Sequence, residues 1–262
     1  MENKFLKIGN KILFKPNLEG LEYNIKPNEV YTLSVDPYTD EISFDIAPSF
    51  NLPSKIYTTP EDDSFLERVI NRYNKTEYGV TGVMLSGIKG TGKTVTAKRL
   101  AILSNLPIIL VDKGFRPRLL QKLFKQLSGI EFCMFFDEID KIGEDYDDSY
   151  LLTILDGVNT VGKSLVLFTC NNERGINENL IDRCSRIRYW RRFKETSREA
   201  VKQVIEDRIN DKKEIESLLD FIMNNFKCVS YDNICSFVDE VNENPTTTFE
   251  ILFSDMNLSN KR

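Results

Sequence analysis

Residues 87–94, Gly-Ile-Lys-Gly-Thr-Gly-Lys-Thr, place glycine, lysine and threonine at a spacing suited to binding phosphate. They fit the pattern G-x-x-x-x-G-K-[ST] at every fixed position. Glycines let the backbone turn tightly and direct its N–H groups toward phosphate oxygens. Lys93 is placed to reach the β and γ phosphates of a nucleotide, and the Thr94 hydroxyl to bind Mg²⁺. The sequence therefore predicts a nucleotide-binding loop formed by Gly87, Ile88, Lys89, Gly90, Thr91, Gly92, Lys93 and Thr94.

Two carboxylates, Asp137 and Glu138, directly follow the apolar run 132–136. Carboxylates at the end of a buried strand are costly unless they face a cation or water. In open α/β sheets, the carboxyl ends of the strands are also where ligands bind. Asp137 is therefore predicted to hold Mg²⁺, directly or through water, and Glu138 to activate the water that attacks the γ-phosphate. With the phosphate loop, this pair predicts hydrolysis of a bound nucleoside triphosphate.

Alternating apolar runs and helical patterns predict the elements that position these residues. Strands are expected over 80–85, 107–111, 132–136, 165–168 and 187–189. Helices are expected over 95–103, over 117–127 and around 151–155. This alternation indicates an α/β fold with a parallel sheet and helices on both faces, as in phosphate-loop NTPases. The continuous apolarity of 132–136 predicts a strand buried on both faces.

The two ends of the chain differ from this middle part. Residues 1–50 contain short alternating runs and a turn at 36–40, which predict a small N-terminal β domain. This domain is either a structural cap on the core or a module that docks a partner, and the sequence leaves both open. Helices over 196–209, 214–226 and 231–241 predict a C-terminal helical lid over 193–262. Residues 51–192 then form the nucleotide-binding domain.

The composition limits the remaining possibilities. The chain has 262 residues, 41% of them hydrophobic and 29% charged, with no apolar run long enough to span a bilayer. A soluble, cytoplasmic protein with no membrane partner is expected. The formal net charge of -5 argues against wholesale electrostatic binding of nucleic acid, although 183–194 is locally basic. The absence of histidine excludes a histidine base or metal ligand.

The sequence Phe-Phe-Asp-Glu-Ile-Asp-Lys-Ile at 135–142, together with the phosphate loop, resembles the AAA+ ATPases. The resemblance continues through 151–157, which is similar to the helix after the acidic motif in the AAA clade of protein-remodelling ATPases. It continues again through 168–172, which matches the first sensor of the family. Asn171 is the matching residue, and its amide could donate to the γ-phosphate or orient the attacking water. The similarity covers about residues 55–242 and does not reach the N-terminal segment.

The resemblance also implies that Arg183 and Arg186 are arginine fingers, which reach the nucleotide of the next subunit. Relatives often carry two arginines at this spacing with Pro-Gly between them, whereas this chain has Cys184 and Ser185. A fixed cation there offsets charge on the γ-phosphoryl oxygens. The alternative is a solvated basic edge, and neither arginine is preferred as the finger.

Three further expectations follow from the family. The adenine site falls in the region of Ile56 and Tyr57. The loop 112–116 corresponds to one that carries a substrate-contacting aromatic residue in threading ATPases. Phe115 is the candidate, and packing of Phe115 at a helix start is the alternative. The protein is expected to form a ring or spiral of identical subunits, a hexamer being one such ring, and to remodel a macromolecule. The acidic loop 143–148 would repel nucleic acid, which favours a protein substrate.

Three other functions stay open at this point. The first is a DNA-associated ATPase, of the helicase-loader or replication-associated type, which is supported by the basic run 183–194. The second is a phosphate-loop kinase. Glu138 and Asn171 argue against it, because a kinase must avoid activating water. The third is a nucleotide-dependent binding switch without significant turnover, against which Glu138 also argues.

Overall fold

The computed structural model describes residues 5–8, 10–14, 24–112, 115–141, 152, 155, 162–173 and 185–258. The chain divides into two compact units. The first comprises Met1–Leu52, Ser64–Ser86 and Thr94–Arg192, and the second comprises Pro53–Asp63, Gly87–Lys93 and Phe193–Arg262. Each unit has its own apolar core. No helix within these described ranges has the length and apolarity needed to cross a membrane.

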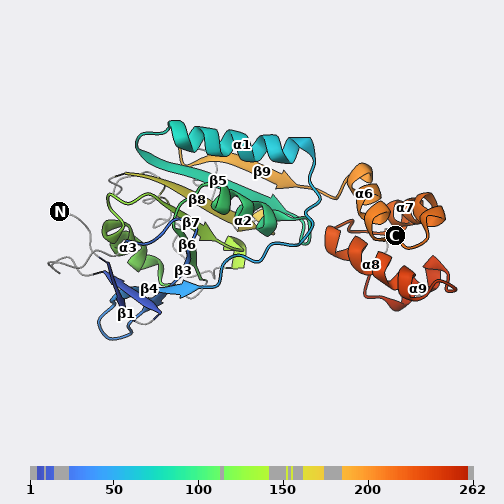
Figure 1. Ribbon diagram of the computed structural model, residues 1–262, viewed down its shortest axis with the longest axis horizontal. Coiled ribbons are helices and arrows are strands. Elements are labelled where there is room, and N and C mark those ends of the chain that lie inside the picture. The colour runs from blue at the N-terminus through green and yellow to red at the C-terminus, as the bar shows by residue number, and fades with distance from the viewer. Residues whose placement is uncertain are drawn as a thin grey trace. The chain divides into compact units, whose positions relative to one another are not determined.

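The first unit is built on one mixed sheet, whose nine described strands run in the order β1-β2-β4-β3-β6-β7-β8-β5-β9 (Figure 1). The strands are β1 (Phe5–Ile8), β2 (Lys11–Phe14), β3 (Val30–Val35), β4 (Ile42–Ala47), β5 (Gly79–Gly87), β6 (Ile108–Val111), β7 (Phe132–Phe136), β8 (Lys163–Cys170) and β9 (Ile187–Phe193). The runs predicted from apolarity are all strands.

The middle of the sheet is parallel. β7 pairs with β6 on one side and β8 on the other, and β8 pairs with β5, all in parallel. Every residue of β7 is buried, as its unbroken apolarity predicts for a strand covered on both faces. The register places Phe136 opposite Phe168, and their rings stack with centroids 5.1 Å apart. The residues that follow β7 and β8 therefore emerge at the same edge of the sheet.

The N-terminal strands form part of this sheet, which differs from the separate small β domain expected over 1–50. β3 and β4 pair in antiparallel fashion, and β3 also pairs in parallel with β6, with Tyr31 opposite Ile109. Tyr31 and Phe44 are fully buried in the same core as the central strands. Periodicity within 1–50 predicted the strands, but pairing with β6 depends on residues distant in sequence. These strands are an extension of the core sheet.

Helices cover the sheet, and those expected over 95–103 and 117–127 are present (Figure 1). They are α1 (Pro60–Lys75), α2 (Lys93–Leu103), the 3₁₀ turn η1 (Pro117–Leu119), α3 (Leu120–Gln126) and the 3₁₀ turn η2 (Ile139–Lys141). In Figure 1, α1 runs beside β9. The ring of Phe65 on α1 meets that of Tyr189 edge-on, at 6.1 Å between centroids. The helix expected around 151–155 lies mostly outside the described residues, although Leu152 and Leu155 are helical.

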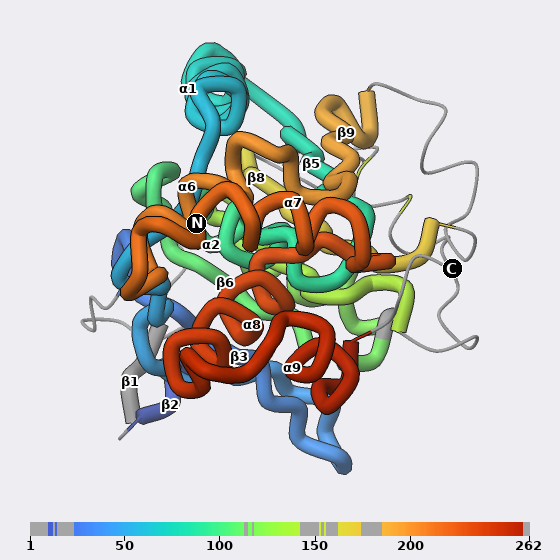
Figure 2. The backbone as a smooth tube through the Cα atoms, turned by 90° about the vertical axis from the view of Figure 1, so that its right-hand side faces the viewer, coloured from blue at the N-terminus to red at the C-terminus, as the bar shows by residue number. Residues whose placement is uncertain are grey.

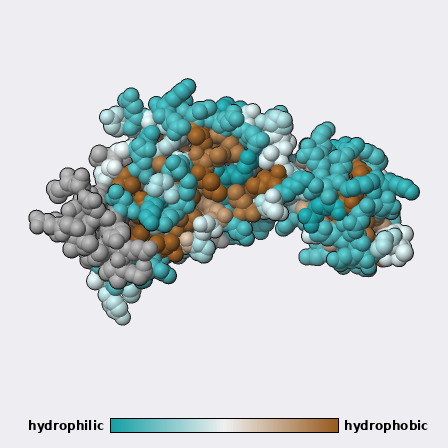
Figure 3. All heavy atoms as spheres, in the orientation of Figure 1, coloured by the Kyte–Doolittle hydropathy of each residue, from teal (hydrophilic) through white to brown (hydrophobic). Residues whose placement is uncertain are grey.

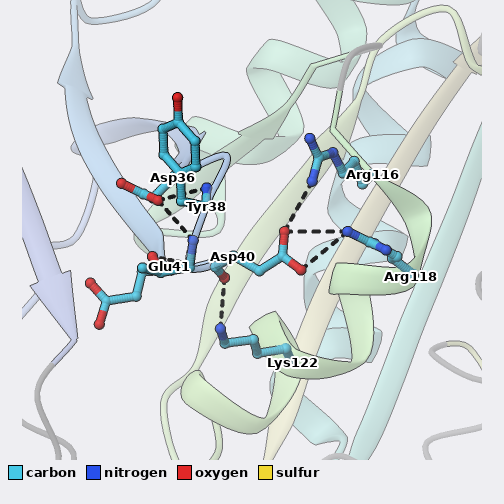
Figure 4. A network of polar contacts seen from close by, with 8 residues as sticks. Asp36, Tyr38, Asp40, Glu41, Arg116, Arg118 and Lys122 are labelled. Atoms are coloured by element: carbon cyan, nitrogen blue, oxygen red, sulfur yellow. Dashed lines mark hydrogen bonds and ion pairs between the residues drawn. The ribbon is translucent and has the colours of Figure 1, made fainter.

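A charged clamp anchors the turn between β3 and β4 (Figure 4). The carboxylate of Asp40 accepts hydrogen bonds from Arg116 at 3.0 Å and from Arg118 at 3.1 Å. Lys122 on α3 donates to the carbonyl oxygen of Asp40 at 2.6 Å. The turn itself is closed by Asp36, whose Oδ1 accepts from the backbone N–H groups of Tyr38 and Thr39. The clamp fixes the N-terminal strands to the segment that follows β6.

The helical part of the second unit is a small bundle. α6 (Arg198–Arg208), the 3₁₀ turn η4 (Lys212–Glu214), α7 (Ile215–Asn225), α8 (Tyr231–Glu243) and α9 (Phe249–Asp255) compose it. Figure 2 looks onto this bundle and shows α6 and α7 on one side, with α8 and α9 on the other. The α9 helix was not predicted. Its Phe253 packs against Phe226 at 5.2 Å between ring centroids.

Two side-chain caps explain where helices of this unit begin. Ser197 caps α6 by accepting from the N–H of Ala200, and Ser230 caps α8 by accepting from Asn233. Apolar residues from α6, α7 and α8 are buried between the helices, and hydrophilic residues cover most of the visible face of the bundle (Figure 3). Burial of this amphipathic face, rather than helix propensity, stabilises the bundle.

Candidate nucleotide-hydrolysing site

The loop between β5 and α2 has the backbone that only glycine adopts easily. Gly87, Gly90 and Gly92 have φ angles of 129°, 74° and 93°. A Cβ on Gly87 would lie 2.0 Å from the carbonyl oxygen of Phe193, so this glycine is also required by close backbone approach. A Cβ on Gly92 would meet nothing within 4 Å. Gly92 therefore needs to be glycine for its conformation alone.

Lys93 and Thr91 are folded onto their own loop. The Lys93 side chain is buried, and its Nζ donates to the carbonyl oxygens of Gly87 at 2.8 Å and Ile88 at 2.6 Å. The Thr91 hydroxyl donates to the same Ile88 carbonyl at 2.6 Å. These contacts hold an ammonium group inside the curve of the loop, where it can meet an anion.

The rest of the second unit supports this loop. The N–H of Ile88 donates to the carbonyl oxygen of Phe193 at 3.2 Å, and the N–H of Tyr231 donates to that of Gly90 at 3.0 Å. The start of α8 is thus hydrogen-bonded to the loop. The hydroxyl of Ser230 would lie 2.9 Å from a Cβ on Gly90, which excludes a larger residue there.

At the carboxyl edge of the sheet, two hydroxyl groups meet the carboxylate of Asp137. Its Oδ1 accepts from the hydroxyl of Thr94 at 3.1 Å and from that of Thr169 at 2.6 Å. Thr94 comes from α2, Asp137 follows β7, and Thr169 belongs to β8. A hydroxyl and a carboxylate are the oxygen ligands that Mg²⁺ prefers.

Glu138 lies beside this group in a strained conformation. Its φ of 54° is left-handed, which for a non-glycine residue costs on the order of 1–3 kcal/mol. Its N–H donates to the Thr169 hydroxyl at 2.7 Å. Its carboxylate accepts from the Asn171 amide at 3.0 Å and from the Lys141 ammonium at 2.6 Å. These two donors fix the orientation of the carboxylate at the edge of the sheet.

Asn171 is itself held by Asp140, whose Oδ1 accepts from the Asn171 N–H at 3.0 Å. The structure thus brings together Thr94, Asp137, Glu138 and Asn171, all of which the sequence singled out. Sequence reasoning missed Thr169 as a connecting residue. A signal was present, because Thr169 is a polar residue within the apolar run of β8 and is only 1% exposed.

The residues expected at the adenine site lie in the second unit. Ile56 is half-buried, and the Tyr57 ring stacks on that of Tyr231 at 6.0 Å between centroids, with an interplanar angle of 13°. The Tyr57 hydroxyl donates to Asp207 at 2.8 Å. Burial, followed by this hydrogen bond, raises the pKa of Tyr57 to about 12, so it is a neutral ring at physiological pH.

The arginine and aromatic candidates have different outcomes. Arg183 lies outside the described residues. Arg186 is only 8% exposed, which does not favour a direct reach toward another subunit. Phe115 is 5% exposed and belongs to the core, so the alternative of packing at a helix start is the correct one. Phe115 is buried because it packs against apolar residues that are distant in sequence. A motif comparison covers only neighbouring residues and therefore does not reveal this packing.

The basic run 183–194 is largely engaged within the chain where it is described. Arg191 lies over the ring of Phe65, at 5.0 Å from its centroid. Arg192 forms an ion pair with Glu173 at 3.1 Å. Arg188 and Lys194 are exposed. The run is therefore not a continuous basic surface over the residues that the structure describes.

The donor set fits a nucleotide with Mg²⁺. The loop offers backbone turns and the Lys93 ammonium, which suit phosphate, while Thr94 and Asp137 offer two oxygen ligands. Within the described ranges, no cluster of three or more carboxylate or thiol ligands could hold a metal on its own. That is the expected composition for Mg²⁺, which usually takes one or two carboxylates and completes its shell with phosphate and water.

The mostly parallel sheet, its helices and the loop after β5 define the α/β fold of the phosphate-loop NTPases. Residues 83–192 match the family model described as "ATPase family associated with various cellular activities (AAA)". The chain therefore contains an AAA domain, which confirms the AAA+ assignment predicted from the sequence. No curated protein matches the chain. The domain indicates a general ATPase function, and proteins of this family generally bind ATP with Mg²⁺ and commonly form oligomers.

Proposed function

We propose that the protein is a Mg²⁺-dependent ATPase in which Glu138 is the general base. The observation that carries this proposal is the position of the Glu138 carboxylate. It lies at the carboxyl edge of the sheet, bound by Asn171 and adjacent in sequence to Asp137, which contacts Thr94. The left-handed backbone of Glu138 is also a feature that clusters at active sites, and it motivates the same assignment.

ATP is the substrate of the proposed reaction. Water attacks the γ-phosphorus, the bond from that phosphorus to the bridging oxygen breaks, and the electron pair stays with ADP. The proton of the water passes to Glu138, and the products are ADP and phosphate. Asn171, which contacts Glu138 through its amide, positions the attacking water or the γ-phosphate.

Binding residues complete this assignment. The loop Gly87–Thr94 holds the phosphates, with Lys93 as the cation that offsets their charge. Thr94 and Asp137 would hold Mg²⁺, which when bound neutralises charge on the phosphate oxygens. Ile56 and Tyr57 contact the adenine ring of the nucleotide. Their assignment is supported by Tyr231, which stacks on Tyr57 and donates to Gly90 of the loop.

We further propose that an oligomer of this chain completes the site and remodels a macromolecular partner. Arg183 is the preferred finger, since Arg186 is buried in the isolated chain. A protein partner is favoured over DNA, because Arg191 and Arg192 of the basic run have contacts within their own chain. ATPase stimulation by single- or double-stranded DNA that weakens steeply with salt would instead support the DNA-associated alternative.

The experiment that tests the proposed base is Glu138→Gln. We expect kcat to fall by about 10²-fold or more, because general base catalysis typically contributes that factor. ATP binding should be retained, since the isosteric amide preserves the loop. The measurement is steady-state phosphate release together with a binding titration with ATP.

Glu131→Gln is the matched control. Glu131 precedes β7 at the opposite edge of the sheet and, like Glu138, has a lysine partner, in this case Lys163 at 3.5 Å. This variant should hydrolyse ATP at the wild-type rate. A Glu138→Gln protein that turns over ATP as fast as wild type would show that Glu138 is not the base. A wild-type protein that binds ATP without turnover would favour the binding switch.

A further inference from the structure

Four residues outside the proposed nucleotide contacts form a closed network at the ends of three strands. Ser86 is in β5, Trp190 and Arg192 are in β9, and Glu173 follows β8. All belong to the first unit. They include the only tryptophan of the chain. The proposed reaction uses none of them.

Each member of the network contacts two others. The Ser86 hydroxyl donates to Glu173 at 2.5 Å and accepts from the Trp190 indole N–H at 2.7 Å. The Arg192 Nε donates to the same carboxylate at 3.1 Å, and the guanidinium lies 4.5 Å from the centroid of the Trp190 ring. Ser86 is fully buried, so its two hydrogen bonds satisfy a group that would otherwise be costly there.

The network members are close in sequence to residues of the proposed ATPase site. Ser86 directly precedes Gly87, and Glu173 comes two residues after Asn171. Arg192 is the last residue of the first unit. Phe193, which follows it, accepts from the N–H of Ile88 in the phosphate loop. A shift at Asn171 therefore acts on Glu173 through the chain, whereas a shift at Gly87 or at Phe193 acts on Ser86 or Arg192, which are bonded to Glu173.

We propose that Glu173 is a positioning residue that couples Asn171 to the phosphate loop and to the segment entering the helical unit. Its carboxylate joins the ends of β8, β5 and β9 through Ser86 and Arg192. Loss of the γ-phosphate, sensed at Asn171, is then transmitted through Glu173 and Arg192 to Phe193. This inference rests on the proposed ATPase function of the same site.

Trp190 makes the network observable. Because it is the only tryptophan, the intrinsic emission of the full chain reports on its hydrogen bond to Ser86 and on the guanidinium over its ring. In a Glu138→Gln background, which prevents turnover, Mg-ATP should shift this emission relative to Mg-ADP. Adding Glu173→Gln should abolish the difference while ATP still binds.

Kinetics of Glu173→Gln in the otherwise wild-type chain provide the second measurement. We expect kcat to fall about 10- to 100-fold through misplacement of Asn171, with KM within about twofold of wild type. Arg192→Gln should show the same loss, and the double variant should be no worse than either single variant, since the pair acts as a unit. Glu67→Gln, an exposed carboxylate on α1, is the control and should leave kcat unchanged.

The outcomes separate the two proposals. Wild-type protein that fails to hydrolyse ATP overturns the proposed function, and this inference with it. The inference alone is overturned if wild-type protein hydrolyses ATP, Glu173→Gln and Arg192→Gln keep the wild-type kcat, and Glu173→Gln keeps the emission difference in the Glu138→Gln background. A general loss of folding in Glu173→Gln or Arg192→Gln would be recognised because it lowers the thermal midpoint and ATP binding together. Arg192→Lys, which keeps the ion pair with Glu173, should retain the wild-type kcat.

Discussion

Thr169 connects the two acidic residues of the candidate site. Its hydroxyl accepts from the Glu138 N–H and donates to the Asp137 carboxylate, so one buried group fixes both. The left-handed backbone of Glu138 persists because this hydrogen bond satisfies its N–H. At the scale of single residues, the geometry of the acidic pair therefore depends on a neutral neighbour from another strand.

Thr169→Val tests this connection. The substitution keeps the shape but removes the acceptor of the half-buried Glu138 N–H, which should cost about 1 kcal/mol of stability. We also expect a lower kcat, because Glu138 and Asp137 lose their common anchor. Urea unfolding and phosphate release are the measurements. Thr169→Ser, which retains the hydroxyl, is the control, and equal behaviour of the two variants would contradict the role of the hydroxyl.

At the scale of elements, the segment before α1 is attached to α6 through Asp207. Its carboxylate accepts from the ammonium of Lys55 and from the Tyr57 hydroxyl. The hydrogen bond from Lys55, followed by that from Tyr57, lowers the pKa of Asp207 below its ordinary value of 3.8. The contact fixes the position of Tyr57, a proposed adenine-binding residue, through a helix that is far away in sequence.

The lowered pKa predicts a pH dependence of stability. Because the folded pKa lies below the unfolded one, the unfolded chain takes up the proton first as the pH falls. The stabilisation from Asp207 is present above about pH 4 and is lost as the pH falls through the folded pKa. Asp207→Asn should therefore lower the urea midpoint at pH 7 and have a smaller effect at pH 3.

The exposed Asp255 of α9 offers the matched control for this experiment. For Asp255→Asn, the difference in urea midpoint from wild type should be about the same at pH 7 and at pH 3. A difference between wild type and Asp207→Asn that does not change with pH would contradict the proposed contribution of the charged carboxylate.

At the scale of the whole molecule, the proposed function depends on other copies of the chain. If an arginine of a neighbouring subunit completes the site, ATPase activity per subunit should rise with protein concentration. A finger contributes roughly 10³- to 10⁵-fold in rate, so the dependence should be steep near the assembly midpoint. Sedimentation at matched concentrations supplies the oligomeric state. Constant activity per subunit down to a monomeric state would exclude a finger that acts between subunits.

The sequence by itself singled out the glycine-rich loop at 87–94, the acidic pair, Asn171 and the strands and helices around them. These are local patterns: glycine spacing, a polar pair after an apolar run, and hydrophobic periodicity within single elements. Most of the sheet was predictable for the same reason, since the strand β7 is apolar throughout. The AAA domain assignment followed from these motifs as well.

Only the tertiary structure decided what depends on contacts between distant segments. The strands of residues 1–50 joined the core sheet because β3 pairs with β6, and periodicity does not specify a pairing partner. Phe115 is buried in the apolar core of the first unit, and the Arg186 side chain is buried as well. Thr169 and Glu173 gained their positions from hydrogen bonds to other strands. Residue type and spacing identified the groups that could do chemistry, whereas long-range packing decided which groups support them.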